Sequence, residues 1–210
     1  MKFKPHKKKR LLEFVVLFIA IPLLLATPIF PMLRLGLGLA GIIYVIFISR
    51  KLKFLSAKRS AGIKMQQFYF LVCRFVLIGI TTYFIVLEFY PKQLFKPLFN
   101  NPIQFAIICF IYMLGSVIPQ EFIYRKFFYK RYHSIFPNER IFIFINGILF
   151  CLAHLFFYNK LVLLMTLIGG WIFSYTYLQT KSLRFTILEH ALYGCWIYAV
   201  GLGSLLGFPE

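Results

Sequence analysis

The residues of this chain that could do chemistry lie in or beside very apolar stretches. They are a carboxylate and a guanidinium, Glu121 and Arg125, and two imidazoles, His154 and His190. A charged side chain at the centre of a membrane helix costs about 2.5–3.5 kcal/mol on insertion scales. Acidic residues are also scarce, since the sequence has only 6 in 210 residues and none of them is Asp. We therefore expect these polar groups to have a function, and an active site within the membrane is the leading hypothesis.

The carboxylate follows a proline near the end of an apolar run. Pro119 has no N–H and displaces the carbonyl of the residue four positions earlier, so a kink is expected just before Glu121. Glu121 and Arg125 are four residues apart and share one helical face, which favours an internal ion pair. Gln120 points about 100° away from Glu121 around the helix.

The two histidines lie in later apolar runs. Phe150 and His154 are four residues apart and again share a helical face. Glu189 directly precedes His190, and adjacent residues of a helix point about 100° apart. Glu189 and His190 therefore need not contact each other. Glu189 could orient a neighbouring imidazole or supply a polar group to a cavity, and the sequence leaves both interpretations open.

A carboxylate and two imidazoles from three helices could hold a water molecule or a divalent metal ion such as Zn²⁺. The ligands of such an ion would be Glu121, His154 and His190. Either arrangement makes a hydroxide-like nucleophile and polarises a carbonyl group. The sequence has no HExxH motif and no Ser or Cys in a recognisable nucleophile motif. Hydrolysis by an activated water is the reaction that these side chains allow.

The elements that must position these residues are membrane helices. The chain is 60% hydrophobic and 20% aromatic, and a soluble domain of this size cannot hide that much apolar surface. We predict an all-α fold, a polytopic transmembrane helical bundle with about seven spans of roughly 20 residues each. The spans are expected at about 11–30, 32–49, 66–87, 102–122, 141–158, 161–179 and 184–206. Residues 1–100 are expected to supply N-terminal anchor helices with basic cytoplasmic segments, and residues 101–206 the helical core that carries the site.

The net charge of +18 is concentrated in short segments between the apolar runs. These basic segments are Lys2–Arg10, Arg50–Lys64, Arg125–Arg140 and Lys181 with Arg184. The segments on the other side hold only Arg34, Lys92, Lys96 and Lys160, and Arg74 lies within the third span. This asymmetry predicts a multi-pass protein of the cell membrane, the inner membrane in a bacterium, with a cytoplasmic N-terminus. Membrane lipids are the expected partners of the basic residues, and nucleic acid is not.

Three ordered motifs resemble those of the CPBP intramembrane proteases, the group of CAAX prenyl endopeptidases and bacterial Abi proteins. The motifs are Gln120-Glu121-xxx-Arg125, Phe150-xxx-His154 and His190-xxx-Gly194, and the resemblance covers roughly residues 100–205. It implies a helical bundle with a polar cavity open within the membrane. It also implies an endopeptidase that cleaves a membrane-associated protein or peptide, a prenylated one in the CAAX type.

The resemblance also assigns roles to single residues. His154 and His190 would be the ligands of a water or a metal ion, and Glu121 would be the structural partner of Arg125. Gln120 stands where the family has the Glu that activates the water, and Gln cannot take a proton. Gly194 stands where the family has an Asn that acts as an oxyanion-type donor.

The sequence leaves three hypotheses about function open. In the first, the chain is an intramembrane endopeptidase, metal-assisted or not, in which His154 and His190 are essential and Glu121 or Glu189 takes over as the base. In the second, the chain is a catalytically inactive pseudoprotease that binds a membrane partner. In the third, it transports an ion or small solute, which the lack of paired discontinuous repeats disfavours.

Overall fold

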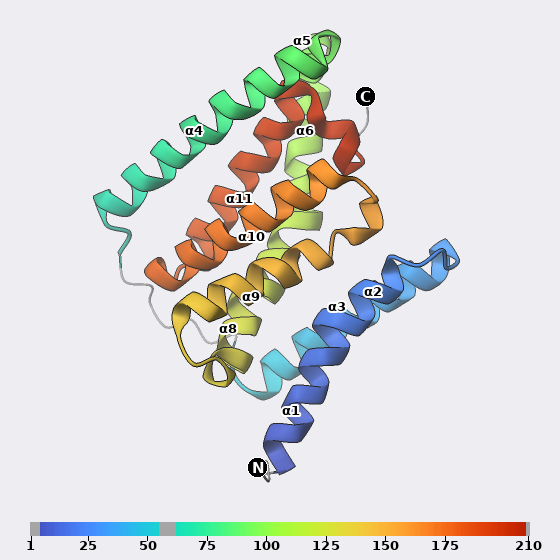
Figure 1. The fold of residues 1–210 in the computed structure, drawn as a ribbon, viewed down its shortest axis with the longest axis vertical. Coiled ribbons are helices and arrows are strands. Elements are labelled where there is room, and N and C mark those ends of the chain that lie inside the picture. The colour runs from blue at the N-terminus through green and yellow to red at the C-terminus, as the bar shows by residue number, and fades with distance from the viewer. Residues whose placement is uncertain (1–4, 55–61, 209–210) are drawn as a thin grey trace. The chain divides into compact units, whose positions relative to one another are not determined.

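The computed structural model describes residues 5–54 and 62–208, and all regular structure in these ranges is helical (Figure 1). The α-helices are α1 (Pro5–Val15), α2 (Ile21–Leu25), α3 (Pro31–Lys51), α4 (Met65–Phe89), α5 (Lys96–Asn100), α6 (Pro102–Tyr112), α7 (Ile118–Glu121), α8 (Phe128–Tyr132), α9 (Glu139–Leu152), α10 (Lys160–Thr180) and α11 (Leu183–Ile197). The predicted all-α class is confirmed. Of the predicted basic segments, Lys2, Lys4, Lys58 and Arg59 lie outside the described residues.

Within the described ranges, 6 helical segments are long and apolar enough to cross a membrane. They are Pro31–Lys51, Met65–Phe89, Pro102–Ile135, Glu139–Phe157, Lys160–Thr180 and Leu183–Leu206. These segments match the second to seventh predicted spans, so the chain is an integral multi-pass membrane protein. The first predicted span, 11–30, is not among them. It is divided into α1, a π-helical turn (Val16–Ala20) and α2, and its helix begins with charged residues.

The fourth span departs from a regular α-helix where the proline predicts it. A π-helical turn (Met113–Val117) separates α6 from α7, which carries Pro119. Because proline cannot donate to the carbonyl four residues earlier, a wider turn absorbs the missing hydrogen bond. A second π-helical turn (Phe122–Phe127) leads into α8, so the helical path continues to residue 135 rather than ending at 122 as predicted.

The chain divides into two compact units. Unit 1 comprises residues 1–57 and 122–175, and unit 2 comprises residues 58–121 and 176–210. Each unit is thus built from two separate stretches of chain. The expected division into residues 1–100 and 101–206 stays a prediction.

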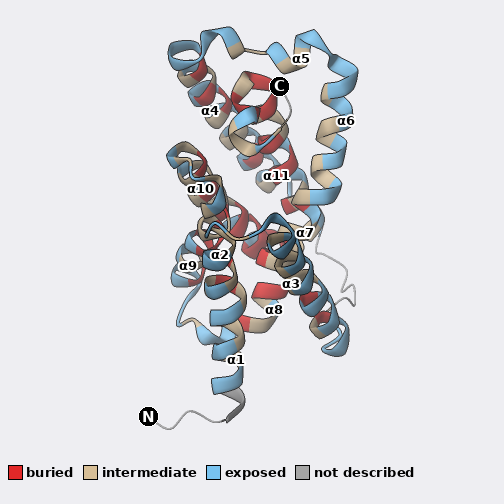
Figure 2. Cartoon of the chain, turned by 90° about the vertical axis from the view of Figure 1, so that its right-hand side faces the viewer, coloured by how far each residue is buried: buried red, intermediate tan, exposed pale blue. Residues whose placement is uncertain are grey.

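Unit 2 packs α11 against α4 and α6 (Figure 1). The indole N–H of Trp196 on α11 donates to Thr82 Oγ1 on α4 at 2.8 Å. Gly79, one turn before Thr82, lies beside this indole, and a Cβ there would make an ordinary van der Waals contact with the ring at 3.6 Å. In Figure 2 much of α11 is buried, whereas long stretches of α4 and α6 are exposed.

Unit 1 contains a close hairpin of α9 and α10. Gly147 and Gly170 lie where the two helices meet, and a Cβ on Gly170 would come within 2.8 Å of the Gly147 Cα. The turn before α10 is capped by Asn159, whose Oδ1 accepts from the N–H groups of Leu161 and Val162. The short connection predicted between these two helices is therefore stabilised by a side-chain cap.

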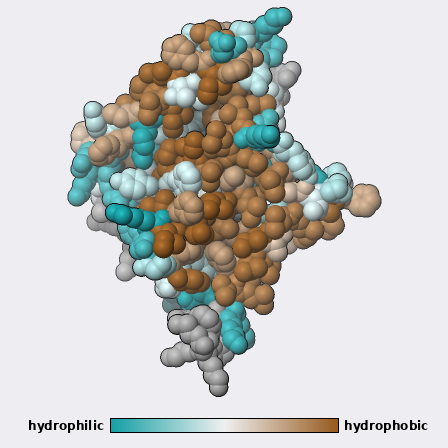
Figure 3. Space-filling view, viewed as in Figure 1, coloured by the Kyte–Doolittle hydropathy of each residue, from teal (hydrophilic) through white to brown (hydrophobic). Residues whose placement is uncertain are grey.

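The surface is largely apolar (Figure 3). Exposed large hydrophobic side chains run along α4 and α6, for example Leu77 and Phe84 on α4 and Ile103 and Ile107 on α6. Such exposure would be unfavourable in water, and it is what a helix facing lipid tails requires. The environment of these helices is therefore lipid.

Candidate functional site

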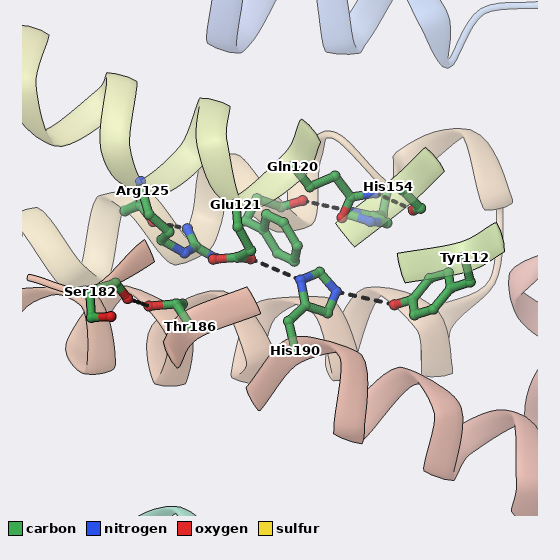
Figure 4. A network of polar contacts seen from close by, with 11 residues as sticks. Tyr112, Gln120, Glu121, Arg125, His154, Ser182, Thr186 and His190 are labelled. Atoms are coloured by element: carbon green, nitrogen blue, oxygen red, sulfur yellow. Dashed lines mark hydrogen bonds and ion pairs between the residues drawn. The ribbon is translucent and has the colours of Figure 1, made fainter. Parts of the chain in front are cut away.

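His190 lies between two polar side chains of unit 2 (Figure 4). It is on α11, which begins at the N-cap Ser182, and its Nδ1 is 2.8 Å from Oε1 of Glu121 on α7. Its Nε2 is 3.2 Å from the hydroxyl of Tyr112, the last residue of α6. The Glu121 side chain is completely buried and that of His190 is 9% exposed. Three helices thus align a carboxylate, an imidazole and a phenol.

The partners of His190 assign its tautomer. An ionised carboxylate can only accept, so the Nδ1 facing Glu121 carries the proton. In the neutral ring Nε2 then holds the lone pair and accepts from the Tyr112 hydroxyl. A carboxylate behind an imidazole fixes its orientation and stabilises the protonated form that arises when the ring takes a proton.

Gly194 lies one helical turn after His190, against the ring of Tyr112. A Cβ on Gly194 would be 2.6 Å from Cζ of Tyr112 and closer still to its hydroxyl oxygen. Real Cβ atoms do not approach other atoms so closely, so a larger residue at 194 requires the phenol to move. The position where the family has Asn is filled here by Tyr112.

Gln120 makes a hydrogen bond along its own helical segment. Its Nε2 donates to Oγ of Ser116 at 2.9 Å, and both residues lie in unit 2. The other amide atom, Oε1, is buried and meets no donor among residues 5–54 and 62–208. The amide at position 120 is therefore held through its nitrogen and presents its oxygen to the interior.

Glu189 is the partner of Arg74. The Nη2 of Arg74 on α4 is 2.8 Å from Oε1 of Glu189, whose side chain is 0% exposed. The hydroxyl of Tyr193 also donates to Oε1, at 3.1 Å, and Arg74 donates to Thr176 Oγ1 at 3.1 Å. Two charges that each seemed out of place in an apolar span thus neutralise each other. Glu189 is thus paired with an arginine whose side chain is 25% exposed, and the two roles left open for it stay predictions.

Arg125 lies in unit 1, within the π-helical turn Phe122–Phe127, and is 1% exposed. Its Nη1 donates to Oδ1 of Asn146 on α9, and Asn146 Nδ2 donates to the Tyr124 carbonyl at 2.9 Å. The guanidinium also lies over the ring of Phe150, 4.8 Å from its centroid. This buried charge is thus stabilised by the side-chain amide of Asn146 and by the face of the Phe150 ring. The ion pair of Arg125 with Glu121 stays a prediction.

His154 lies just beyond the end of α9, in unit 1, and is 9% exposed. Its Nδ1 is 2.7 Å from the carbonyl oxygen of Phe150, and the two rings are 4.7 Å apart. The predicted shared face of these two residues is therefore present. A carbonyl only accepts, so Nδ1 carries the proton and Nε2 holds the lone pair of the neutral ring.

The fit to a metal ion can be tested on the predicted ligands. The described part of the chain has no group of three or more His, Cys, Asp and Glu side chains arranged to hold a metal ion. Both ring nitrogens of His190 are engaged by Glu121 and Tyr112. A metal ligand needs a lone pair directed at the ion. Glu121 and His190 of unit 2 thus do not make a metal site by themselves, and one that also includes His154 of unit 1 stays a prediction.

Three residues with a role in these polar clusters were not predicted as site residues. Tyr112 and Asn146 carry no sequence signal of their own, because Tyr is abundant in apolar spans and Asn146 belongs to no motif. Arg74 did give a signal, since an arginine within a predicted span needs a counter-charge. Pairing it with Glu189 would have required knowing that α4 lies beside α11.

Comparison with known proteins gives one match. The family model described as Type II CAAX prenyl endopeptidase Rce1-like matches residues 102–196, a little under half of the chain. No curated protein and no solved structure matches the chain. The matched range begins at α6 and ends within α11, and it contains all three motifs, whereas Arg74, the partner of Glu189, lies outside it. Residues 102–196 of this multi-pass membrane protein are therefore similar to the Rce1-like family of type II CAAX prenyl endopeptidases.

Proposed function

We propose that the protein is an intramembrane endopeptidase of the CAAX type, which hydrolyses a peptide bond of a membrane-associated protein or peptide with an activated water. The observation that carries this proposal is the buried pair of Glu121 and His190, with 2.8 Å between Oε1 and Nδ1. The family match over residues 102–196 supports the reaction class.

His190 is the general base in this proposal. Its Nε2 takes a proton from water while the water oxygen bonds to the carbonyl carbon of the substrate, and Glu121 stabilises the imidazolium. When the C–N bond breaks, the proton on Nε2 passes to the leaving amine, and the products are a carboxylate and an amine. Such positioned proton transfer contributes about 10²–10⁴-fold to rate.

The other polar groups have supporting roles. Gln120 cannot take a proton, and Glu189 is bound by Arg74, so neither is proposed as the base. The resemblance to the CPBP proteases assigns His154 to the binding of water or a metal ion, and the hydrogen bond from its Nδ1–H to the Phe150 carbonyl orients the ring. Arg125 holds α9 in place through the hydrogen bond from its Nη1 to Asn146.

The proposal can be tested in cells by comparing protein N-termini. Cells would express wild type, His190→Ala, Glu121→Gln or His133→Ala at equal levels. His133 is the matched control, because it packs against the rings of Tyr129 and Phe142 and takes part in neither polar cluster. We expect new termini with wild type and His133→Ala, and their loss in the other two variants. The same termini in cells expressing folded His190→Ala would contradict the proposal.

The pseudoprotease is the second candidate, and Gln120 favours it. Its Nε2 is bound to Ser116, as a neutral packing residue would be. If the Gln at this position has abolished hydrolysis, Gln120→Glu should create termini that wild type does not produce. If wild type is active, as we propose, the same substitution should add no new cleavage sites.

The orientation in the membrane is part of the proposal. We place the N-terminus in the cytoplasm, because the basic segments lie on that side in the predicted topology. An N-terminal epitope tag should then resist protease in right-side-out vesicles and be removed in inverted ones.

A further inference from the structure

We propose that Tyr112 is a catalytic residue, whose hydroxyl donates a hydrogen bond to the carbonyl oxygen of the substrate as the tetrahedral intermediate forms. This inference rests on the proposed function and adds to it a donor that lies outside the three sequence motifs. It starts from the space beside Gly194, which the phenol occupies.

The phenol is held in one place by several contacts. Its ring lies 5.0 Å from the ring of Phe208 and edge-on to the ring of His190, with centroids 6.2 Å apart. The π-helical turn Met113–Val117 begins directly after it, and Gly194 offers the flat surface on which it rests. Tyr112 is therefore fixed with its hydroxyl 3.2 Å from Nε2 of His190.

The lone pair on Nε2 is the reason for assigning chemistry to this hydroxyl. In the neutral tautomer Nε2 has one lone pair, which accepts from Tyr112 in the resting site. The attacking water must first replace the Tyr112 hydroxyl at Nε2, and once Nε2 has taken the proton of this water it is a donor and can no longer accept. The O–H of Tyr112 is then released at the moment when negative charge forms on the substrate oxygen. A donor that becomes available at this point stabilises the transition state rather than the ground state.

The position of this donor follows from the glycine. Residue 194 is one turn after the general base on the same face of α11, so a side chain there would point into the space beside His190. Glycine supplies no group, and the hydroxyl of Tyr112 lies where the Cβ would be. A side chain at position 194 and the phenol of Tyr112 therefore cannot occupy this space together. A donor at position 194 can replace the hydroxyl of Tyr112.

Exchange of the two positions tests the proposal. Tyr112→Phe keeps the ring and removes only the donor, and we expect kcat to fall about 100-fold, the lower range for loss of one oxyanion donor. Gly194→Asn alone should also lose activity, because its side chain meets the phenol. The double variant Tyr112→Ala, Gly194→Asn places an amide donor in the vacated space and should recover activity to within about tenfold of wild type.

The measurement is the rate of cleavage of the substrate found by the N-terminal comparison, with purified full-length protein in lipid vesicles. The unfolding midpoint of each variant in detergent controls for folding. Tyr112→Phe with wild-type kcat would overturn the proposal and leave the base assignment standing, as would a higher kcat, which would mean that the phenol only blocks Nε2. Absence of cleavage by wild type would instead remove the proposed function and this inference with it.

Discussion

The ion pair of Arg74 and Glu189 predicts an asymmetric effect of removing each charge. Arg74→Met leaves a carboxylate that is 0% exposed and keeps hydrogen bonds from neutral groups such as Tyr193 but no positive charge beside it. Glu189→Gln leaves a guanidinium that is 25% exposed and still donates to Thr176. The arginine can extend toward the membrane surface, whereas the carboxylate cannot. Arg74→Met should therefore be the more destabilising change.

The magnitudes follow from the cost of an uncompensated buried charge. Removing one partner of a buried ion pair costs about 3–5 kcal/mol, and we expect Arg74→Met in this range. For Glu189→Gln we expect about 1.5–3 kcal/mol, the value of hydrogen bonds to a charged group. The double variant Arg74→Met, Glu189→Met removes both charges and should lie within about 1 kcal/mol of wild type, since apolar replacement of a whole buried pair is often neutral.

The assay is reversible unfolding in mixed micelles, followed by the loss of helical signal as the denaturing detergent is increased. Glu88→Gln on the same helix is the matched control, because Glu88 is exposed and its replacement should leave the unfolding free energy within about 0.5 kcal/mol. Equal stability of Arg74→Met and wild type would refute the argument. A double variant as unstable as the sum of the single variants would refute it too.

Three further predictions concern other parts of the chain. Glu13→Gln removes the carboxylate that accepts from Nε and Nη2 of Arg131, at 2.8 and 2.6 Å, and should cost about 1.5–3 kcal/mol at neutral pH. Burial raises the pKa of Glu13, but hydrogen bonds from Arg131 and two tyrosines and the Arg131 charge outweigh it and leave the pKa below 4.5. The advantage of wild type should thus persist above pH 4.5 and vanish as the pH falls through the lower folded value, and unfolding with and without the substitution measures it. Gly147→Ala should lower the unfolding free energy by about 1–3 kcal/mol, because its Cβ would come within 2.9 Å of Trp171 Cγ; unchanged stability in the same assay would show that α9 and α10 are less close. Dialysis against a chelator should leave cleavage unchanged, because His190 activates the water in the proposed reaction without a metal ion; activity that is lost and then restored by Zn²⁺ would contradict this.

The fold was largely predictable from the sequence. Each of the six spans was evident from its length and apolar composition, and Pro119 located the irregular turn of the fourth span. The first span was the exception, since its helical path ends at Leu25, which leaves the helix only the first part of the apolar stretch of residues 11–30. Apolar length is a local property, so no knowledge of packing was needed.

The polar contacts were less predictable, because they depend on which helices are neighbours. Helical spacing predicted that Phe150 and His154 lie close together, and their rings are 4.7 Å apart although His154 lies just beyond the end of α9. It could not predict that Glu121 binds His190, 69 positions away, or that Glu189 binds Arg74. The role of Tyr112 was also hidden, since only the closeness of two helices shows that Gly194 makes room for it.

The central claim is that His190, held by Glu121, activates a water molecule for peptide hydrolysis. The most direct test is cleavage of the identified substrate by purified protein in ¹⁸O-labelled water, with mass spectrometry of the new C-terminus. Our account predicts one ¹⁸O atom in the new carboxylate with wild type, and a rate at least about 100-fold lower with Glu121→Gln, because the amide no longer fixes the tautomer. Cleavage without ¹⁸O, or an equal rate with Glu121→Gln, would contradict it.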